Sequence, residues 1–228
     1  MTDQRAPQPR PVQAPWAASV AGILFAIMFT AAMLLLRTSP LIAQDDRTLA
    51  RLFAQGGDLS IVVGGLYLGP FAGITFLWFV AVVRDQIGER EDKFFATVFL
   101  GSAILFVALL FVALAVASTP VVAVRYLDLP APSAEEARLA RSLSYTLLFG
   151  FATRAAAVFL ISTATLGLRT GGLPRWFALT GYVAGAILLV VVSFWDWIIL
   201  LLPAWVAAIS VSILRRERAA RRTAATTG

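Results

Sequence analysis

The sequence predicts an all-α integral membrane protein: a six-transmembrane-helix bundle with a short amphipathic surface helix in its first outer loop. Three observations predict this class. The 228 residues are 59% hydrophobic and only 14% charged, whereas soluble domains are about half apolar and about a quarter charged. The apolar residues form runs of about 17 to 26 residues, the length at which a helix crosses a hydrocarbon core of roughly 30 Å. These runs are uniformly apolar, unlike the alternating strands of a β-barrel.

The predicted organisation is one membrane domain between two cytoplasmic tails. Residues 1–15 are rich in proline and polar residues, which predicts a disordered tail. Residues 215–228 form a basic tail. The last apolar region is nearly twice as long as one span requires, so we divide it by a turn at Asp196. The six predicted spans of the domain 16–214 are 16–36, 59–83, 94–117, 143–168, 176–193 and 197–214.

The first apolar run and the loop after it are predicted to be two separate helices. The run from Trp16 to Leu36 is longer than the apolar part of a signal peptide, and no small-residue cleavage pattern follows it directly, so it is predicted to stay as a span. In the outer loop, Leu49, Leu52 and Phe53 recur at helical spacing before two glycines. This pattern predicts a short amphipathic helix over about 44–55, lying on the outer membrane interface.

The second span carries a stripe of glycines and a proline. Gly65, Gly69 and Gly73 are four residues apart, a spacing that favours close approach of another helix. Pro70 has no backbone N–H, so it frees the carbonyl of Leu66 near the middle of the span. Two interpretations remain open: a close helix contact, or a broken helix that lines a substrate site as in transporters.

The fourth span is predicted to begin above the membrane and to contain a buried cation. Ser133 and Glu136 form a capping-box pattern, so the helix is expected to start there and to continue as one long rod. Arg154 lies near the middle of the span, where insertion of an arginine costs about 2.5 to 3.5 kcal/mol. We therefore expect Arg154 to face the bundle or a wet cavity. Gly150, Ala157, Ile161 and Thr165 share its face, and the small ones allow another helix to come close.

The hydrogen-bond acceptors of Arg154 are predicted from the absence of carboxylates in the spans. No aspartate or glutamate lies inside any span, so we expect Arg154 to donate to backbone carbonyls around Leu66, together with the hydroxyl groups of Tyr67 or Tyr182. Arg154 is then either a structural clamp or an anion site beside the break at Gly69 and Pro70.

The distribution of charge predicts the orientation. With six spans, twelve basic residues fall on the side of the two tails and six on the other side, so both termini are predicted to be cytoplasmic. Eighteen of the 19 basic residues are arginine, and alanine is abundant. This bias is typical of GC-rich bacterial genomes, so we expect a multi-pass protein of a bacterial plasma membrane. The net charge of +6 comes mostly from "RRERAARR" and is read as a topology signal, not as a nucleic-acid site.

The residue types exclude several kinds of chemistry. The chain has no cysteine and no histidine, which removes disulfides, thiol nucleophiles, imidazole metal ligands and histidine ligation of haem. The sequence also lacks G-x-S-x-G, H-E-x-x-H and Walker motifs, and has no pair of aspartates inside a span. We therefore expect no enzymatic activity, no metal and no cofactor.

Two stretches carry a family resemblance. "PFAGITFLWFVAVVRDQIGEREDKFFATVFLGSAILFVALLFVA" and "RAAAVFLISTATLGLRTGGLPRWFALTGY" resemble a group of uncharacterised bacterial multi-pass membrane proteins with no assigned activity. The resemblance spans most of residues 58–214. It implies six helices with an "LPRW" turn before the fifth, and it implies no function.

Two classes of function remain at this point. The first is an accessory or interaction subunit, whose partners would be the lipid bilayer and a membrane protein or further copies of this chain. The second is a small-solute or anion transporter or channel with Arg154 beside the broken second helix.

Overall fold

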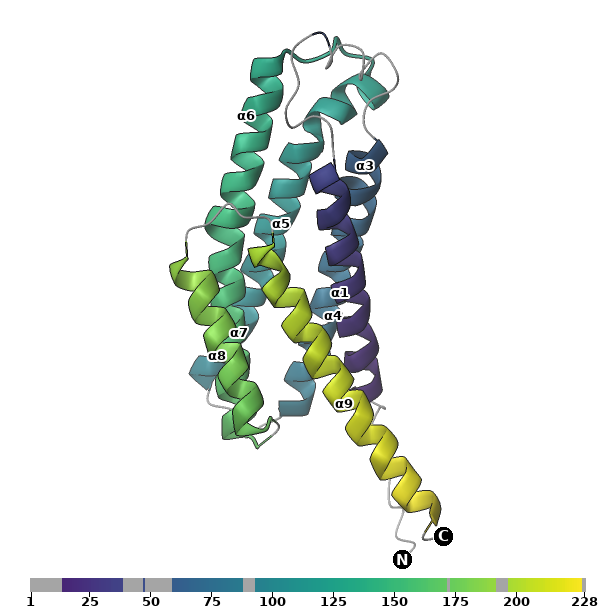
Figure 1. Cartoon of the computed structure of the whole chain (residues 1–228), viewed down its shortest axis with the longest axis vertical. Coiled ribbons are helices and arrows are strands. Elements are labelled where there is room, and N and C mark those ends of the chain that lie inside the picture. Colours follow the sequence, from purple (N-terminus) through teal and green to yellow (C-terminus); the bar gives the residue numbers. More distant parts are fainter. Residues whose placement is uncertain are drawn as a thin grey trace, which may run out of the picture.

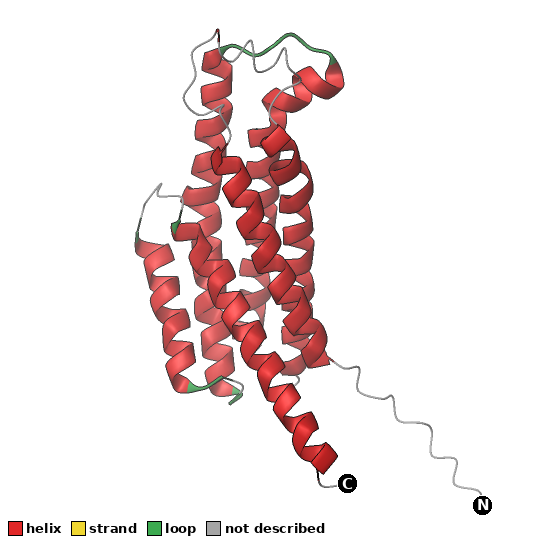
Figure 2. Cartoon of the chain, turned by 45° about the vertical axis from the view of Figure 1, so that its right-hand side comes forward, coloured by secondary structure: helices red, strands yellow, loops and turns green. Residues whose placement is uncertain are grey.

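The computed structural model describes residues 14–38, 47, 59–87, 93–171, 173–191 and 197–226. All regular structure in these residues is helical (Figure 2), which confirms the all-α prediction. The surface helix predicted at 44–55 lies outside the described residues except for Arg47, and so do residues 1–13 and the turn at Asp196.

The helices form a bundle in which consecutive long elements run antiparallel (Figure 1). Helix α3, the π-helical segment η2 and helix α4 form one continuous element, as do α6, η4 and α7. Helix α1 begins and helix α9 ends at the same end of the bundle (Figure 1). The elements are α1 (Ala14–Thr38), α3 (Leu59–Ile61), η2 (Val62–Leu68), α4 (Gly69–Ile87), α5 (Lys93–Leu127), α6 (Ala134–Tyr145), η4 (Thr146–Ala152), α7 (Thr153–Arg169), α8 (Arg175–Val190), η5 (Ile198–Leu200) and α9 (Leu201–Thr226).

Five helices are long and apolar enough to cross a membrane, and they coincide with five of the six predicted spans. The remaining prediction, 176–193, corresponds to α8. Its 16 residues extend about 24 Å, less than a hydrocarbon core of about 30 Å. A membrane crossing by α8 therefore stays a prediction. The five long apolar helices are Trp16–Arg37, Leu59–Arg84, Phe94–Leu127, Ala134–Arg169 and Ile198–Arg215.

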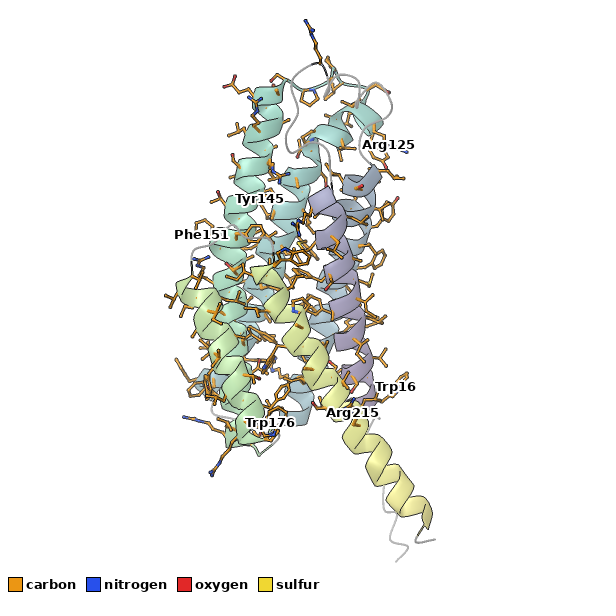
Figure 3. All side chains as sticks on the ribbon, viewed as in Figure 1. Trp16, Arg125, Tyr145, Phe151, Trp176 and Arg215 are labelled. Carbon is orange, nitrogen blue, oxygen red and sulfur yellow. The ribbon has the colours of Figure 1, made fainter. Side chains whose placement is uncertain are left out.

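Two elements are longer than a membrane is thick. Helix α5 has 35 residues and the rod from Ala134 to Arg169 has 36, so each extends more than about 50 Å. Even at a tilt of about 40°, a helix needs only about 40 Å to cross the hydrocarbon core. Each element is therefore longer than one crossing requires. Figure 3 places Arg125 at the upper end, and Trp16, Trp176 and Arg215 at the lower end of the bundle.

The start of the long rod confirms the predicted capping box. The Ser133 side chain accepts from the backbone N–H of Glu136, and the Glu136 carboxylate accepts from the backbone N–H of Ser133 at 2.8 Å. Two helix-end donors are thereby satisfied at the N-terminal end of α6.

Replacing Ser133 with alanine is expected to fray the first turn of α6 and to lower stability by about 1 kcal/mol. Hydrogen exchange of the amides of residues 134–137 is the measurement, because the loss is local. Ser133→Asp keeps an oxygen acceptor at the cap and should retain most of the protection. Equal protection in wild type and Ser133→Ala would contradict the capping role.

The centre of the bundle is a cluster of phenylalanines. Aromatic rings from α1, α4, α5 and α7 meet there, with Phe76 contacting Phe25, Phe106 and Phe159 at centroid distances of 4.7 to 5.3 Å. These rings are fully buried, so they are hidden from lipid as well as from water. They fix the relative positions of α1, α4, α5 and α7.

The glycines of the second span contact a helix, which confirms the close-packing interpretation. A β-carbon on Gly65, Gly69 or Gly73 would lie 2.2 to 2.5 Å from a side-chain atom of α5. The α5 residues that fill these positions are Ser118, Leu114 and Phe111, respectively. The stripe therefore lies against α5.

Candidate functional site

Arg154 lies in the first turn of α7, directly after the π-helical segment η4, and its side chain is half-buried. Its level in the bundle follows from helix lengths. Fifteen residues of α7 separate it from Arg169 at the lower end, a distance of about 22 Å. Helix α8 runs antiparallel beside α7 and rises about 24 Å from Arg175 to Val191. The end of α8 and Arg154 therefore lie at the same level.

The guanidinium group of Arg154 is hydrogen-bonded to protein atoms on two elements. Its Nη1 donates to the backbone carbonyl of Phe149 and, at 2.9 Å, to the hydroxyl oxygen of Thr153. The Thr153 hydroxyl donates to the same Phe149 carbonyl at 2.6 Å. On the other side, Nη2 of Arg154 lies 3.5 Å from the carbonyl oxygen of Val191. One cation thus connects η4 with the end of α8.

The end of α8 offers acceptors for a cation at this level. The last carbonyls of a helix have no partner within the helix, and they carry the negative end of its dipole. Val191, whose carbonyl lies near Arg154, is the C-cap residue of α8. Arg154 supplies a charged donor there. The geometry therefore fits a structural clamp between the start of α7 and the end of α8.

The prediction that Arg154 contacts a backbone carbonyl is confirmed, but the predicted partner is wrong. The acceptors are Phe149 and Val191, and the carbonyl of Leu66 is not among them. The Tyr182 hydroxyl instead bonds the Thr165 hydroxyl at 2.8 Å, three turns below Arg154 on α7. The reason is that α8, and not the second span, covers the face of α7 that carries Arg154.

The other predicted site residues of the second span lie apart from Arg154. Tyr67 is 56% exposed on the outer surface of η2. Gly69 is buried against Leu114 of α5. Pro70 is the second residue of α4, next to the end of η2. The turn before it is π-helical: the N–H of Gly69 bonds to the carbonyl of Gly64, five residues back. The missing N–H of Pro70 falls at this junction. Gly69 and Pro70 thus lie at a helix junction.

A second cluster of polar groups, which the sequence analysis missed, lines a cavity in the upper half of the bundle. The cavity has a volume of about 90 Å³ and includes Arg37 and Arg141 in its wall. The guanidinium of Arg37 lies 4.6 Å from the centre of the Trp197 ring, and that of Arg141 lies 4.5 Å from the Tyr145 ring. The spacing of four residues between Arg141 and Tyr145 was the only sequence signal for this cluster.

No family model matches the chain, and no curated protein and no solved structure is similar to it. Among the described residues, no group of three or more carboxylate, imidazole or thiol side chains is placed to hold a metal ion.

Proposed function

We propose that this chain is an accessory subunit of a bacterial plasma membrane that holds a partner protein through a basic cytoplasmic arm. The arm is the part of α9 from Arg215 to Thr226, which continues beyond the end of the last apolar stretch. The observation that carries the proposal is that this segment stays helical and projects away from the bundle (Figures 1 and 2).

The composition of the arm favours a protein partner over the lipid surface. It contains five arginines and one glutamate, and its other residues are alanine and threonine. A helix that lies in a membrane interface buries large apolar side chains on one face, and this arm has none. An arginine-rich helix in water is suited to bind an acidic protein surface, where guanidinium groups form two-point contacts with carboxylates.

Six crossings with both termini in the cytoplasm are part of the proposal. The excess of arginine at the lower end supports this orientation. An even number of passes is supported by the start of α1 and the end of α9, which lie at the same end of the bundle (Figure 1). In this proposal α8 is the fifth pass. Because α8 is short, Arg154 donates to the carbonyl at its end.

A transporter built around Arg154 has less support. The hydrogen bonds of Arg154 go to the chain's own backbone and to Thr153, and Arg154 is not part of the wall of the upper cavity described above. An anion site needs donors that point into accessible space. In the clamp, the N–H groups of Arg154 instead donate to acceptors of the same chain.

Charge reversal in the arm is expected to abolish partner binding without loss of the membrane domain. A photo-crosslinker at Ala220 in native membranes should capture a discrete protein partner. The triple variant R218E/R221E/R222E should reduce this product about tenfold or more, because like charges then face each other. Its lysine counterpart, R218K/R221K/R222K, keeps the charge and should retain most of the product. High salt should weaken the wild-type product.

The control for this experiment is the orientation of the chain, since arginines also set topology. The chain has no native cysteine, so a single cysteine at Thr223 reports which side of the membrane holds the C-terminus. Crosslinks to lipid alone, or equal protein crosslinks in the glutamate and lysine variants at unchanged topology, would rule out the proposal.

A further inference from the structure

An apolar groove runs along the surface of the bundle between α8 and α9. Each of these helices packs mainly against another partner, α8 against α7 and α9 against α1. Towards the lower end of the bundle, α9 diverges from α8 (Figures 1 and 2). The groove has a volume of about 440 Å³, within the range of about 300–1,000 Å³ that is typical of small-molecule sites. Its described wall comes from Trp176 to Ile187 on α8 and from Leu201 to Trp205 on α9.

The inside of the groove suits an apolar occupant. Aliphatic and aromatic side chains form most of its described wall, and two of them, Leu179 and Val183, are more than half exposed. The hydroxyl group in this wall, on Thr180, already has a hydrogen bond in each direction. It donates to the Phe177 carbonyl at 2.6 Å and accepts from the indole N–H of Trp205 at 3.2 Å. The groove therefore offers contact area to hydrocarbon and not hydrogen bonds to a polar ligand.

The length of the groove matches one leaflet of a membrane. Its wall follows α8 from Trp176 to Ile187, a rise of about 16 Å. Half of the hydrocarbon core is about 15 Å thick. A transmembrane helix of another protein would need a contact surface of about twice this length to be covered across the membrane. The groove therefore fits an acyl chain of one leaflet better than it fits a crossing helix.

The lower mouth of the groove carries positive charge. Arg175 is exposed and directly precedes Trp176, which is the wall residue at this end. Arg215 is also exposed, and it lies at the same end of the bundle as Trp176 (Figure 3). Neither α8 nor the part of α9 before Arg215 contains an aspartate or a glutamate. Because tryptophan favours the membrane–water interface, the two arginines lie at headgroup level, where they attract a phosphate group.

We propose that this groove binds an anionic phospholipid from the leaflet at the lower end of the bundle. One acyl chain lies between α8 and α9, and Arg175 and Arg215 attract the headgroup phosphate. A soluble phosphate would use the arginines alone, so the apolar groove is the feature that favours a lipid. The inference rests on α8 as a membrane helix, which is part of the proposed function. It does not use the arginines at 218, 221 and 222, so either proposal can fail without the other.

Native mass spectrometry of the full chain in detergent tests the groove. The protein is incubated with phosphatidylglycerol or with phosphatidylcholine, and the lipid-bound fractions are compared. Wild type should retain phosphatidylglycerol preferentially. Ala204→Trp should lower the retention of both lipids at least about fivefold, because the indole ring fills the space of the acyl chain. Ala186→Trp is the matched control: Ala186 is an exposed alanine of α8 outside the described wall, so this variant should retain lipid as wild type does. Circular dichroism and thermal stability report that both variants are folded.

A second variant keeps the groove and removes the charge at its mouth. R175Q/R215Q should lower the retention of phosphatidylglycerol about tenfold and leave that of phosphatidylcholine unchanged. Arg125→Gln, at the opposite end of the bundle (Figure 3), should behave as wild type. Inorganic phosphate at millimolar concentration should leave the bound lipid in place. Equal retention in Ala204→Trp and Ala186→Trp, no preference for phosphatidylglycerol, displacement by inorganic phosphate, or a bound polypeptide in place of the lipid would each overturn the proposal.

Discussion

Replacing Arg154 with leucine is expected to loosen the hairpin of α8 and α9 and to lower the melting temperature in detergent. The change removes the donor to the Phe149 and Val191 carbonyls. The Phe149 carbonyl keeps the Thr153 hydroxyl as a donor, so the loss falls mainly on the Val191 carbonyl. An acceptor that loses its donor costs about 1–3 kcal/mol, and hydrogen bonds between membrane helices lie at the low end of that range. A total of about 2 kcal/mol corresponds to a fall in Tm of about 4–8 °C for a chain of this size.

The loss should be concentrated at the end of α8. Hydrogen exchange of the amides of residues 188–191 should accelerate more than that of the phenylalanine-rich centre, because the clamp acts locally. Arg154→Lys keeps the charge, but its single ammonium cannot reproduce the two-sided contact, so its Tm should fall between wild type and Arg154→Leu.

Arg138→Leu is the matched control for this prediction. Arg138 is an exposed arginine near the start of the same rod, so its replacement should leave Tm within about 2 °C of wild type. If Arg154→Leu instead kept its full stability and abolished an anion flux measured in vesicles, Arg154 would be a transport residue and the clamp would be wrong.

Replacing Gly185 with leucine is expected to have the largest effect on stability. A β-carbon on Gly185 would lie 2.6 Å from Cγ1 of Ile161 and 3.0 Å from the backbone oxygen of Ala157. The Ile161 side chain can rotate, but the backbone oxygen cannot, so α8 must move away from α7. Overpacking of this kind costs about 3 kcal/mol, which corresponds to a fall in Tm of about 6–12 °C.

Gly101 provides the matched control for Gly185. It also lies within a helix, yet a β-carbon there would meet no atom within 4 Å. Gly101→Leu should therefore be neutral or stabilise by up to about 1 kcal/mol, because glycine is a poor helix former. The double variant G185L/I161A should recover part of the loss, since it removes one of the two contacts. Equal melting temperatures for Gly185→Leu and Gly101→Leu would refute close packing at Gly185.

Local features were predictable where their cause lies in neighbouring residues. The capping box depends on Ser133 and Glu136, which are three residues apart, and the structure forms it as predicted. The face of α7 with Ala157 and Ile161 was also predicted to contact another helix, and it does. Both rest on local hydrogen bonding or on helical periodicity, which the order of residues determines directly.

The identity of the helix on that face was not predictable. Our prediction placed the second span beside Arg154, since Pro70 frees a carbonyl there. Instead, the glycines of the second span lie against α5, and α8 occupies the face with Arg154. The apolar faces of membrane helices resemble each other and the lipid, so hydropathy does not select between partners.

The sequence by itself determined an all-helical protein with long apolar segments, a capped rod, and an intramembrane arginine that needs acceptors from the protein. Hydropathy, helix period and the energetic cost of a charge in lipid are sufficient for these conclusions. Only the tertiary structure decided which carbonyls Arg154 satisfies and that Arg37 and Arg141 share one cavity. These arrangements depend on shape complementarity between residues far apart in the chain.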